Sequence, residues 1–409
     1  MPGPTDLGDV RRRNLSLVLR TLDAHAPCAR SDIRAATGLV NGTVASLVDD
    51  LVARGLVAEL GTSADGGRGR PRRLLRVLPD RALSVAVRLT PHLVVGEVRR
   101  FDGSQVWEEH QEHAVRRGHG QDVVDALAGA LGRATAVATA HPAGWVAQTV
   151  VAVPAPVVAG TAIGAAIEFG LGRTELHEAL RPLASPTGDL VIRNDGRLGA
   201  LAEHAAIAPE ERPRTMAYVV GGLGVGGGLV VDGELFLGAH AMAGECGHIS
   251  VDARGPECDC GARGCLALYL GLPALLSGAG LTGHAERSGH DAALDELVRR
   301  LQRQDPTAHE SVDRAGAALA AAIGTMSNYT DLDLVVLGGT LPRLYPWLQP
   351  HVDRLVRSRA RRITEFNPRT ALARHGEEAP LRGAWLLARR SVLQDPDRVP
   401  LLDRGDRPG

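Results

Sequence analysis

The feature that most constrains the fold is a pattern that occurs twice. Residues 82–103 and 216–233 each contain an apolar segment, a short turn, and a second apolar segment that ends in Asp-Gly. A helical pattern follows each copy, at 121–140 and at 311–328. Further strand-like apolar segments occur at 146–154, 189–195 and 332–339. Strands that alternate with helices predict an α/β fold. The duplication predicts two similar lobes, and a cleft between lobes is where ligands usually bind.

The chain also has a distinct N-terminal region. Apolar residues follow helical spacing in a first helix, at Leu15, Val18, Leu19 and Leu22. Ser31-Asp32 can cap a second helix that stops at Gly38, and Asn41 or Thr43 opens a third. Two helices joined by a short turn, with small polar residues on the first turn of the second helix, are the helix-turn-helix pattern. Ser31, Asn41, Thr43 and Ser46 are therefore predicted to contact DNA.

A glycine- and arginine-rich loop follows these helices. The loop, GTSADGGRGRPRR, lies between two short apolar segments, which predicts a β-wing. Its guanidinium groups, at Arg68 and Arg70 among others, suit phosphates or a narrow minor groove. Residues 1–78 contain 12 arginines against 8 acidic residues, whereas the whole chain has a net charge of −1. A basic end on a near-neutral protein indicates a polyanionic partner. The alternative is a three-helix protein-interaction module with a solvated basic loop.

Four of the five cysteines lie within residues 244–265. His248, Cys258, Cys260 and Cys265 have the spacing H-x9-C-x-C-x4-C, and one imidazole with three thiolates is a donor set typical of structural zinc. Zn²⁺ is the only cofactor that this pattern predicts, because it would hold a loop with little apolar content. Cys246 is expected to point elsewhere. The alternative is a group of reduced cysteines with a histidine nearby by chance.

Two further motifs each allow two interpretations. The run Gly222 to Gly228 predicts either a phosphate-binding loop, through its backbone N–H groups, or a tight hairpin turn. Asn194-Asp195 ends a predicted strand, and it predicts either a general base with a residue that orients it or a helix cap. No run approaches 18 apolar residues, so no membrane span is predicted. The N-terminus lacks the apolar core of a secretory signal.

Taken together, the motifs resemble the ROK family, named for repressors, open reading frames and sugar kinases. The motifs that carry the resemblance are the helix-turn-helix with its GRGRP wing, VAVPAPV, RNDGRLGALAEH, GLGVGGGLVVDG, GECGH, CDCGARGC and VVLGG. The resemblance implies a multidomain protein in which a winged helix-turn-helix precedes an α/β, actin-like (ribonuclease-H-like) two-lobed domain. It also implies a cytoplasmic location, homodimers or homotetramers, and sugar or sugar-phosphate ligands.

The resemblance also implies domain boundaries and residue roles. Residues 1–78 would be the winged helix-turn-helix and 79–409 the ROK domain. The first lobe would cover about 79–195 with a C-terminal helix at about 380–395, and the second about 196–379 with the zinc loop. The residues implied to bind sugar are Asn194, Asp195, Glu245 and His248, and Asp195 matches the base of the family's kinases.

Several positions depart from the family's pattern. The first-lobe phosphate loop of the kinases, Asp-x-Gly-x-Thr, is replaced by residues 87–91, VRLTP, which lack both the acid and the glycine. Phosphoryl transfer needs bound Mg²⁺ and a cradle for the triphosphate, so the change points away from ATP. Leu223 replaces a threonine in the second phosphate loop. Ala155 and Ala267 replace a glycine and a glutamate at the sugar site, and loss of that carboxylate removes hydrogen bonds to sugar hydroxyls.

These observations predict a DNA-binding transcriptional regulator, most simply a repressor, of carbohydrate metabolism, rather than an enzyme. Its partners would be double-stranded operator DNA and a carbohydrate effector, with no membrane. One alternative is an ATP-dependent sugar kinase with a fused winged helix. Another is a regulator that is controlled by a protein partner.

Overall fold

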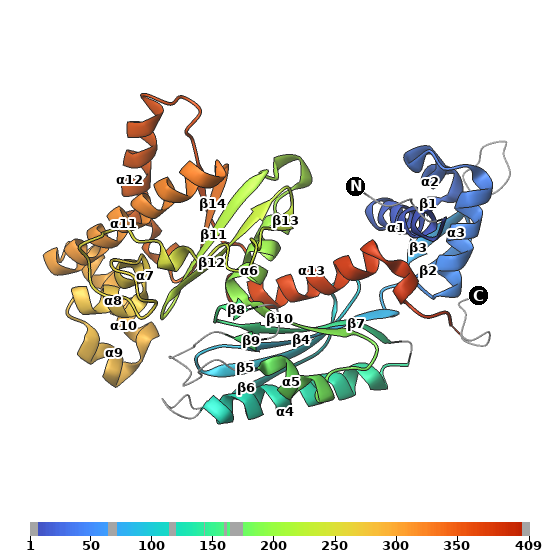
Figure 1. Ribbon diagram of the computed structural model, residues 1–409, viewed down its shortest axis with the longest axis horizontal. Coiled ribbons are helices and arrows are strands. Elements are labelled where there is room, and N and C mark those ends of the chain that lie inside the picture. Colours follow the sequence, from blue (N-terminus) through green and yellow to red (C-terminus); the bar gives the residue numbers. More distant parts are fainter. Residues whose placement is uncertain are drawn as a thin grey trace.

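The computed structural model describes residues 7–63, 72–113, 120–142, 144–158, 162–163 and 175–402. They form an N-terminal unit of helices with a small sheet, and two lobes that are each built on a five-stranded sheet (Figure 1). The strand order is β10-β7-β4-β5-β6 in the first lobe and β13-β12-β11-β14-β15 in the second. In both sheets the strand that comes first in the sequence is central and pairs antiparallel with the next. The predicted duplication is therefore two copies of one sheet topology.

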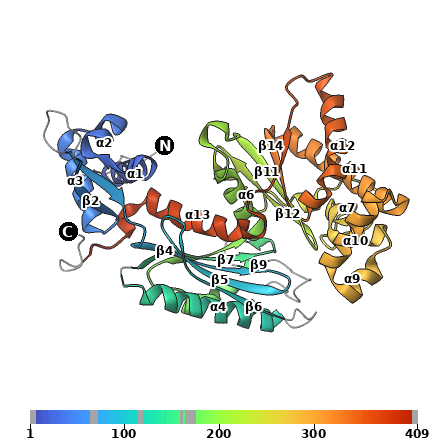
Figure 2. The same cartoon turned by 180° about the vertical axis from the view of Figure 1, so that it is seen from behind.

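The first lobe places its sheet between two helices. Its strands are β4 (Ala82–Leu89), β5 (Leu93–Arg100), β6 (Gln105–Glu112), β7 (Trp145–Val153) and β10 (Asp189–Asn194). Helix α4 (Gly120–Ala140) covers one face and α13 (Ala379–Gln394) the other (Figures 1 and 2). Alternate side chains of a strand point to opposite faces, so Val85 and Val87 pack in the core that contains α4, whereas Ala86 packs with α13. The short elements β8 (Val157–Val158), β9 (Ala162–Ile163) and α5 (Leu176–Leu180) complete the lobe.

Helix α4 is the one described helix that is long and apolar enough to cross a membrane by length and composition. Its residues Leu127, Leu131 and Ala134 are fully buried in the core of the first lobe. The apolar character of α4 is thus explained by its packing on β4 and β5.

The second lobe repeats this arrangement with more helices. Its strands are β11 (Thr215–Gly221), β12 (Val225–Val231), β13 (Glu234–Leu235), β14 (Leu334–Gly339) and β15 (Arg369–Leu372). Helix α6 (Asp195–Ala205) packs on the face that presents Met216 and Tyr218. The other helices pack on the face that presents Ala217 and Val219. They are α7 (Ala267–Leu270), α8 (Leu272–Gly278), α9 (Thr282–Ser288), α10 (His290–Gln302), α11 (Pro306–Thr330) and α12 (Leu341–Ala360).

The N-terminal unit has the elements of a winged helix. These are α1 (Leu7–His25), β1 (Cys28–Ala29), α2 (Arg30–Thr37), α3 (Asn41–Ala53), β2 (Val57–Ser63) and β3 (Arg72–Val77). The strands form an antiparallel sheet in the order β1-β3-β2. The predicted apolar stripe of α1 is confirmed, because Leu15, Val18, Leu19 and Leu22 are fully buried. Gly38 ends α2 in the left-handed conformation, as predicted.

The predicted cap of α2 was wrong. Ala29 is the N-cap residue, and Asp32 lies within the first turn, where its carboxylate accepts a hydrogen bond from the Ala29 N–H at 2.9 Å. The short β1 strand displaces the helix start toward the N-terminus, because its pairing with β3 fixes Cys28 and Ala29 in an extended conformation.

The N-terminal unit and the first lobe share one apolar core. Leu22 and Leu51 belong to the same buried cluster as Phe101 and Trp145 of the first lobe and Val392 of α13. The Ser16 hydroxyl donates a hydrogen bond to the carbonyl of Leu393 at 2.6 Å. Figure 2 shows α13 running along the first-lobe sheet toward α1. The N-terminal unit is therefore packed against the body rather than connected by a free linker.

Candidate functional site

The candidate ligand site begins where β10 ends and α6 starts, at the junction of the two lobes. Asn194 is buried and caps α6: its Oδ1 accepts a hydrogen bond from the Arg197 N–H at 3.1 Å. Its Nδ2 donates to the carbonyl of Ala155, also at 3.1 Å. Asn194 thus acts as a helix cap, one of the two predicted alternatives, and this capping orients the adjacent Asp195 toward the junction.

Asp195 is the first residue of α6, and its Oδ1 accepts a hydrogen bond from the Gly196 N–H at 2.7 Å. Burial raises the pKa of the Asp195 carboxyl, and the positive charge of Arg88 acts in the opposite direction. A guanidinium is therefore the cation that faces Asp195, at a position where the family's kinases are expected to carry an acid.

Arg88 lies near the end of β4, and its Nη1 donates to the carbonyl of Glu377 at 2.5 Å. The residues after it form a tight turn, in which the hydroxyl of Thr90 accepts a hydrogen bond from the Leu93 N–H at 2.9 Å. This turn presents a side-chain cation and a satisfied hydroxyl. A loop that cradles phosphate presents free backbone N–H groups instead.

Glu245 faces the same junction from the GECGH segment. Its Oε1 accepts a hydrogen bond from Nη2 of Arg197 at 2.9 Å, and the side chains of Arg197 and Glu245 are 3% and 20% exposed. Burial raises the pKa of the Glu245 carboxyl, although Arg197 and His248 act against this change. Arg197 is a site residue that sequence reasoning missed. The available signal was an arginine on the first turn of α6, two residues after Asp195.

The glycine run between residues 222 and 228 fits neither predicted role. None of these glycines is among the residues with positive φ. Instead, β12 passes so close to its neighbours that a Cβ on Gly227 would lie 2.3 Å from the Tyr218 carbonyl oxygen. A Cβ on Gly228 would lie 2.9 Å from the Cα of Arg197. Because such approaches exclude any side chain, the glycines allow α6 and the Glu245 segment to pack on β12.

The predicted metal ligands come together. His248, Cys258, Cys260 and Cys265 each offer one ligand atom, and these atoms all lie within 4.8 Å of one another. Nδ1 of His248 is 3.7 Å from Sγ of Cys258, and Sγ of Cys260 is 3.5 Å from Sγ of Cys265. One nitrogen and three sulfurs at these separations fit a single tetrahedral metal ion. Since His248 turns Nδ1 toward the sulfurs, its Nε2 stays available for a second partner.

Local backbone structure explains this cluster. Gly261 and Gly264 have positive φ values of +89° and +61°, which glycine adopts without strain. The Cys258 N–H donates to the Ala262 carbonyl at 2.8 Å and closes the turn that carries Cys260. A backbone hydrogen bond from Ala262 lowers the pKa of Cys260, whereas burial raises the pKa of Cys265 to about 12.

Cys246 lies apart from the metal cluster, as predicted. It is buried, and its Sγ donates to the carbonyl of Gly226 at 3.2 Å. Burial raises the pKa of this thiol to about 12. Among the alanines that depart from the family pattern, Ala155 is buried and Ala267 begins α7.

The predicted DNA-contacting residues lie on the surface of the N-terminal unit. Asn41 and Ser46 on α3 are exposed, Thr43 is half-buried, and Ser31 on α2 is exposed. Val40, which precedes α3, is 70% exposed. Arg68 and Arg70 lie outside the described residues. The structure thus leaves the first turn of α3 accessible to a macromolecule.

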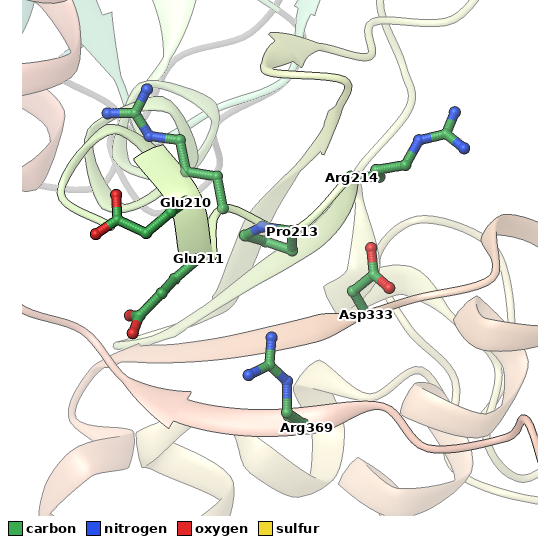
Figure 3. A pocket seen from close by; sticks show the side chains of 7 residues that line it. Glu210, Glu211, Pro213, Arg214, Asp333 and Arg369 are labelled. Carbon is green, nitrogen blue, oxygen red and sulfur yellow. The ribbon is translucent and has the colours of Figure 1, made fainter. Parts of the chain in front are cut away.

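A shallow depression on the second lobe is a separate feature (Figure 3). It is lined by acidic and basic side chains together, including Glu210, Glu211, Arg214, Asp333 and Arg369. Arg214 pairs with the exposed Asp232 at 3.0 Å, and Asp333 accepts a hydrogen bond from the Thr215 N–H. No predicted site residue lines it, so it is not part of the candidate site.

The comparisons with known proteins agree with this geometry. The model of the ROK family matches residues 104–391. The chain belongs to the ROK family. It is 30% identical over 234 residues to the N-acetylmannosamine kinase of Yersinia pestis (strain Pestoides F), a match that spans 57% of this chain and 75% of that protein.

Two solved ROK structures share the fold. A ROK family transcriptional regulator, described as a homologue of the E. coli MLC protein, has a TM-score of 0.76 at 19% identity and covers 94% of this chain and 97% of its own. The ROK hexokinase from Thermus thermophilus has a TM-score of 0.58 at 24% identity and covers 76% of this chain and 99% of its own. The structural likeness to the regulator therefore extends over more of this chain.

Proposed function

We propose that this ROK protein is a DNA-binding transcriptional regulator, most simply a repressor, whose two-lobed body senses a carbohydrate. The observation that carries the proposal is the exposed, polar first turn of α3 in a winged helix that is packed against a ROK body. Asn41 and Ser46 present an amide and a hydroxyl, which are groups that hydrogen-bond to base edges and phosphates. The likeness of the fold to a regulator over 94% of the chain supports the same role.

Operator binding would use two copies of the chain. A recognition helix enters the major groove through its N-terminal residues, and two-fold related helices reach half-sites about one helical turn apart. A homodimer or homotetramer with its recognition helices on one side would meet this requirement. Arg68 and Arg70 of the wing would add contacts to phosphates or the minor groove. A regulator of this kind acts in the cytoplasm, where the DNA is.

The carbohydrate effector would bind at the interlobe junction. Asn194, Asp195, Glu245 and His248 are the residues proposed to contact it, because Asp195 and Glu245 converge there and His248 keeps one ring nitrogen free. Catalysis is not part of this proposal. Arg88 faces Asp195 and donates to the carbonyl of Glu377. A divalent cation with a triphosphate requires an acidic, open position at that point.

Zinc is the metal proposed for the cluster of His248 and the three cysteines. Three thiolates and an imidazole in a closed set are the donors typical of a structural Zn²⁺ site. A bound ion would crosslink the loop that begins at His248 and ends at Cys265, and so would fix the position of the Glu245 segment. His248 would link the metal to the effector through its second nitrogen.

The second candidate function is an ATP-dependent sugar kinase with a fused winged helix. It is favoured by Asp195 at the position of the kinase base and by a 30% identical relative named as a kinase. Arg88 argues against it. Sustained ATP-dependent phosphorylation of hexoses or amino sugars by the purified chain would replace the regulator proposal, and its absence would support it.

The central experiment measures DNA binding by the full chain. Fragments of the source genome are selected by the purified protein, and binding of the enriched fragment is followed by fluorescence anisotropy. We expect saturable binding that a variant with Asn41→Ala and Ser46→Ala weakens by at least tenfold, since each base contact contributes about 1–3 kcal/mol. Arg34→Ala, an exposed change on α2, serves as the control. If no fragment is enriched, the proposal is wrong.

A further inference from the structure

The charged side chains at the interlobe junction do not balance. Three arginines, at positions 88, 193 and 197, lie around two carboxylates, Asp195 and Glu245. Arg197 pairs with Glu245 at 2.9 Å, and Arg88 is the positive charge that acts on Asp195. These two pairings use both carboxylates. Arg193 is left as a cation without an acidic partner among the described residues.

Arg193 occupies a position that faces this cluster. It lies on β10, one residue before the capping Asn194, and β10 is an edge strand of the first-lobe sheet. The side chain is half-buried. Its Nη1 donates to the carbonyl of Ile192 at 2.8 Å, and no carboxylate of the described residues forms an ion pair with it. The guanidinium has five N–H donors, so most of its donor capacity remains unused by the protein.

The surroundings of Arg193 are unfavourable to its charge. Burial lowers the pKa of Arg193, and the nearby positive charge of Arg197 lowers it further. The Nε atoms of Arg88 and Arg197 are also buried without a hydrogen-bond partner. A buried cation is retained when an anion pairs with it, because an unpaired buried charge is costly. These three observations indicate the same missing component, which is an anionic group.

We propose that the carbohydrate bound at this junction carries a carboxylate or a phosphate, and that Arg193 binds this group. The proposal rests on the proposed function, in which an effector occupies the interlobe site. It adds the chemical class of the effector and the residue that selects it. A guanidinium suits this role because its planar pairs of N–H donors match the two oxygens of a carboxylate or phosphate. Glu245, already held by Arg197, would be left to contact a hydroxyl through its second oxygen.

The test uses matched sugars and the full-length protein. Isothermal titration calorimetry compares glucose with glucose 6-phosphate and glucuronate, and compares N-acetylglucosamine and N-acetylmannosamine with their 6-phosphates. We expect a charged member to bind at least tenfold more tightly than its neutral counterpart, the difference of one charge-assisted hydrogen bond. The phosphate and carboxylate arms show which anion the site takes. Inorganic phosphate alone is the probe for a simple anion site.

Two variants assign the effect to Arg193. Arg193→Gln keeps the length of the side chain and removes its charge, and it should abolish the preference while leaving affinity for the neutral sugar unchanged. Arg214→Gln removes one charge from an exposed position of the second lobe and should retain the preference. A thermal melt of Arg193→Gln should match the wild type, since no acidic partner is lost.

The remaining outcomes would overturn the inference. It fails if neutral sugars bind as tightly as charged ones, if Arg193→Gln keeps the preference, or if inorganic phosphate alone binds as tightly as the charged sugar. Binding of neutral sugars alone leaves the proposed carbohydrate sensing intact and removes only this inference. If no sugar of either kind binds while DNA binding persists, carbohydrate sensing and the inference fail together.

Discussion

Arg54, at the end of α3, forms an ion pair with Asp397 in which Nη2 lies 2.7 Å from Oδ1. Its Nη1 also donates to the carbonyls of Asp397 and Val399. The Leu402 N–H donates to the carbonyl of Ala53 at 2.8 Å. The helix proposed to read DNA is thus held at its C-terminal end by the segment that follows α13. A change in α13 would therefore be passed directly to α3.

Arg54→Ala should destabilise this junction. The change removes an ion pair and two hydrogen bonds from a guanidinium whose side chain is only 12% exposed. We expect the free energy of unfolding to fall by about 2–3 kcal/mol, the range for buried hydrogen bonds to a charged group. Urea denaturation followed by circular dichroism measures the loss. Arg34→Ala, on the exposed face of α2, should change stability by less than about 0.5 kcal/mol. Equal effects of the two changes would contradict the contact.

Gly227→Ala tests the close packing of β12. The added Cβ would lie 2.3 Å from the Tyr218 carbonyl oxygen and 2.6 Å from Sγ of Cys246. We expect a loss of at least about 1–3 kcal/mol, as for overpacked cores. Gly222→Ala is the control, since its Cβ meets nothing within 4 Å. Denaturation midpoints compare the two. A phosphate-binding role for the run, in contrast, would make both variants stable and would reduce nucleotide affinity instead.

Cys260→Ser tests the metal site. The variant loses one of four ligand atoms, so we expect the zinc content of the purified protein to fall from about one ion per chain towards zero. Thermal stability should fall as well, because metal binding and folding of this loop are coupled. Cys246→Ser is the matched control. It removes a nearby thiol that lies outside the cluster and should keep the metal. Elemental analysis measures both, and an unchanged zinc content in Cys260→Ser would refute the ligand assignment.

Asp195→Asn should change stability in a pH-dependent direction. Because burial raises the pKa of Asp195 in the folded protein, its contribution to stability is fully present in acid and is lost as the pH rises through that pKa. At pH 7.5 the wild type buries a charge that the variant lacks. The variant should then be at least as stable as the wild type, and its advantage should shrink at pH 5. Thermal melts at the two pH values measure this. An advantage that grows in acid would show that the sign is wrong.

Arg70→Ala tests the wing. Loss of one phosphate contact should reduce the slope of log K against log salt concentration by about 0.9 for duplex DNA. The measurement is an anisotropy titration of the enriched fragment between 50 and 200 mM salt. Arg214→Ala, on the second lobe, should leave the slope unchanged. An unaltered slope for Arg70→Ala would mean that this residue does not contact phosphate.

Local sequence patterns predicted most of the regular elements. The apolar segment 146–154 corresponds to β7 at Trp145–Val153, and 189–195 corresponds to β10 at Asp189–Asn194. These strands are buried and rich in Val, so their composition alone distinguishes them. By contrast, β6 has an exposed, polar pattern at Gln105–Glu112, and β1 contains only two residues. Both become strands through pairing with a neighbour, which no local pattern contains.

The site was predictable where its residues are close in sequence. The metal cluster lies within 18 positions, and its spacing was sufficient to place all four ligands together. The pair of Arg197 and Glu245 joins residues 48 positions apart, and Arg54 and Asp397 are 343 positions apart. Contacts of this kind depend on how α6, β12 and α13 pack. The ambiguity of Asn194 was likewise resolved only by its hydrogen bonds to Ala155 and Arg197.

Helix α13 supplies one face of the first-lobe sheet, although it is encoded more than 180 positions after the last strand of that sheet. During synthesis on the ribosome, the first lobe and the winged helix emerge early but lack this face until the end of the chain has been translated. A polypeptide released before residue 379 would therefore expose apolar strands to chaperones and proteases. Only a finished polypeptide would carry a DNA-reading unit that is firmly mounted.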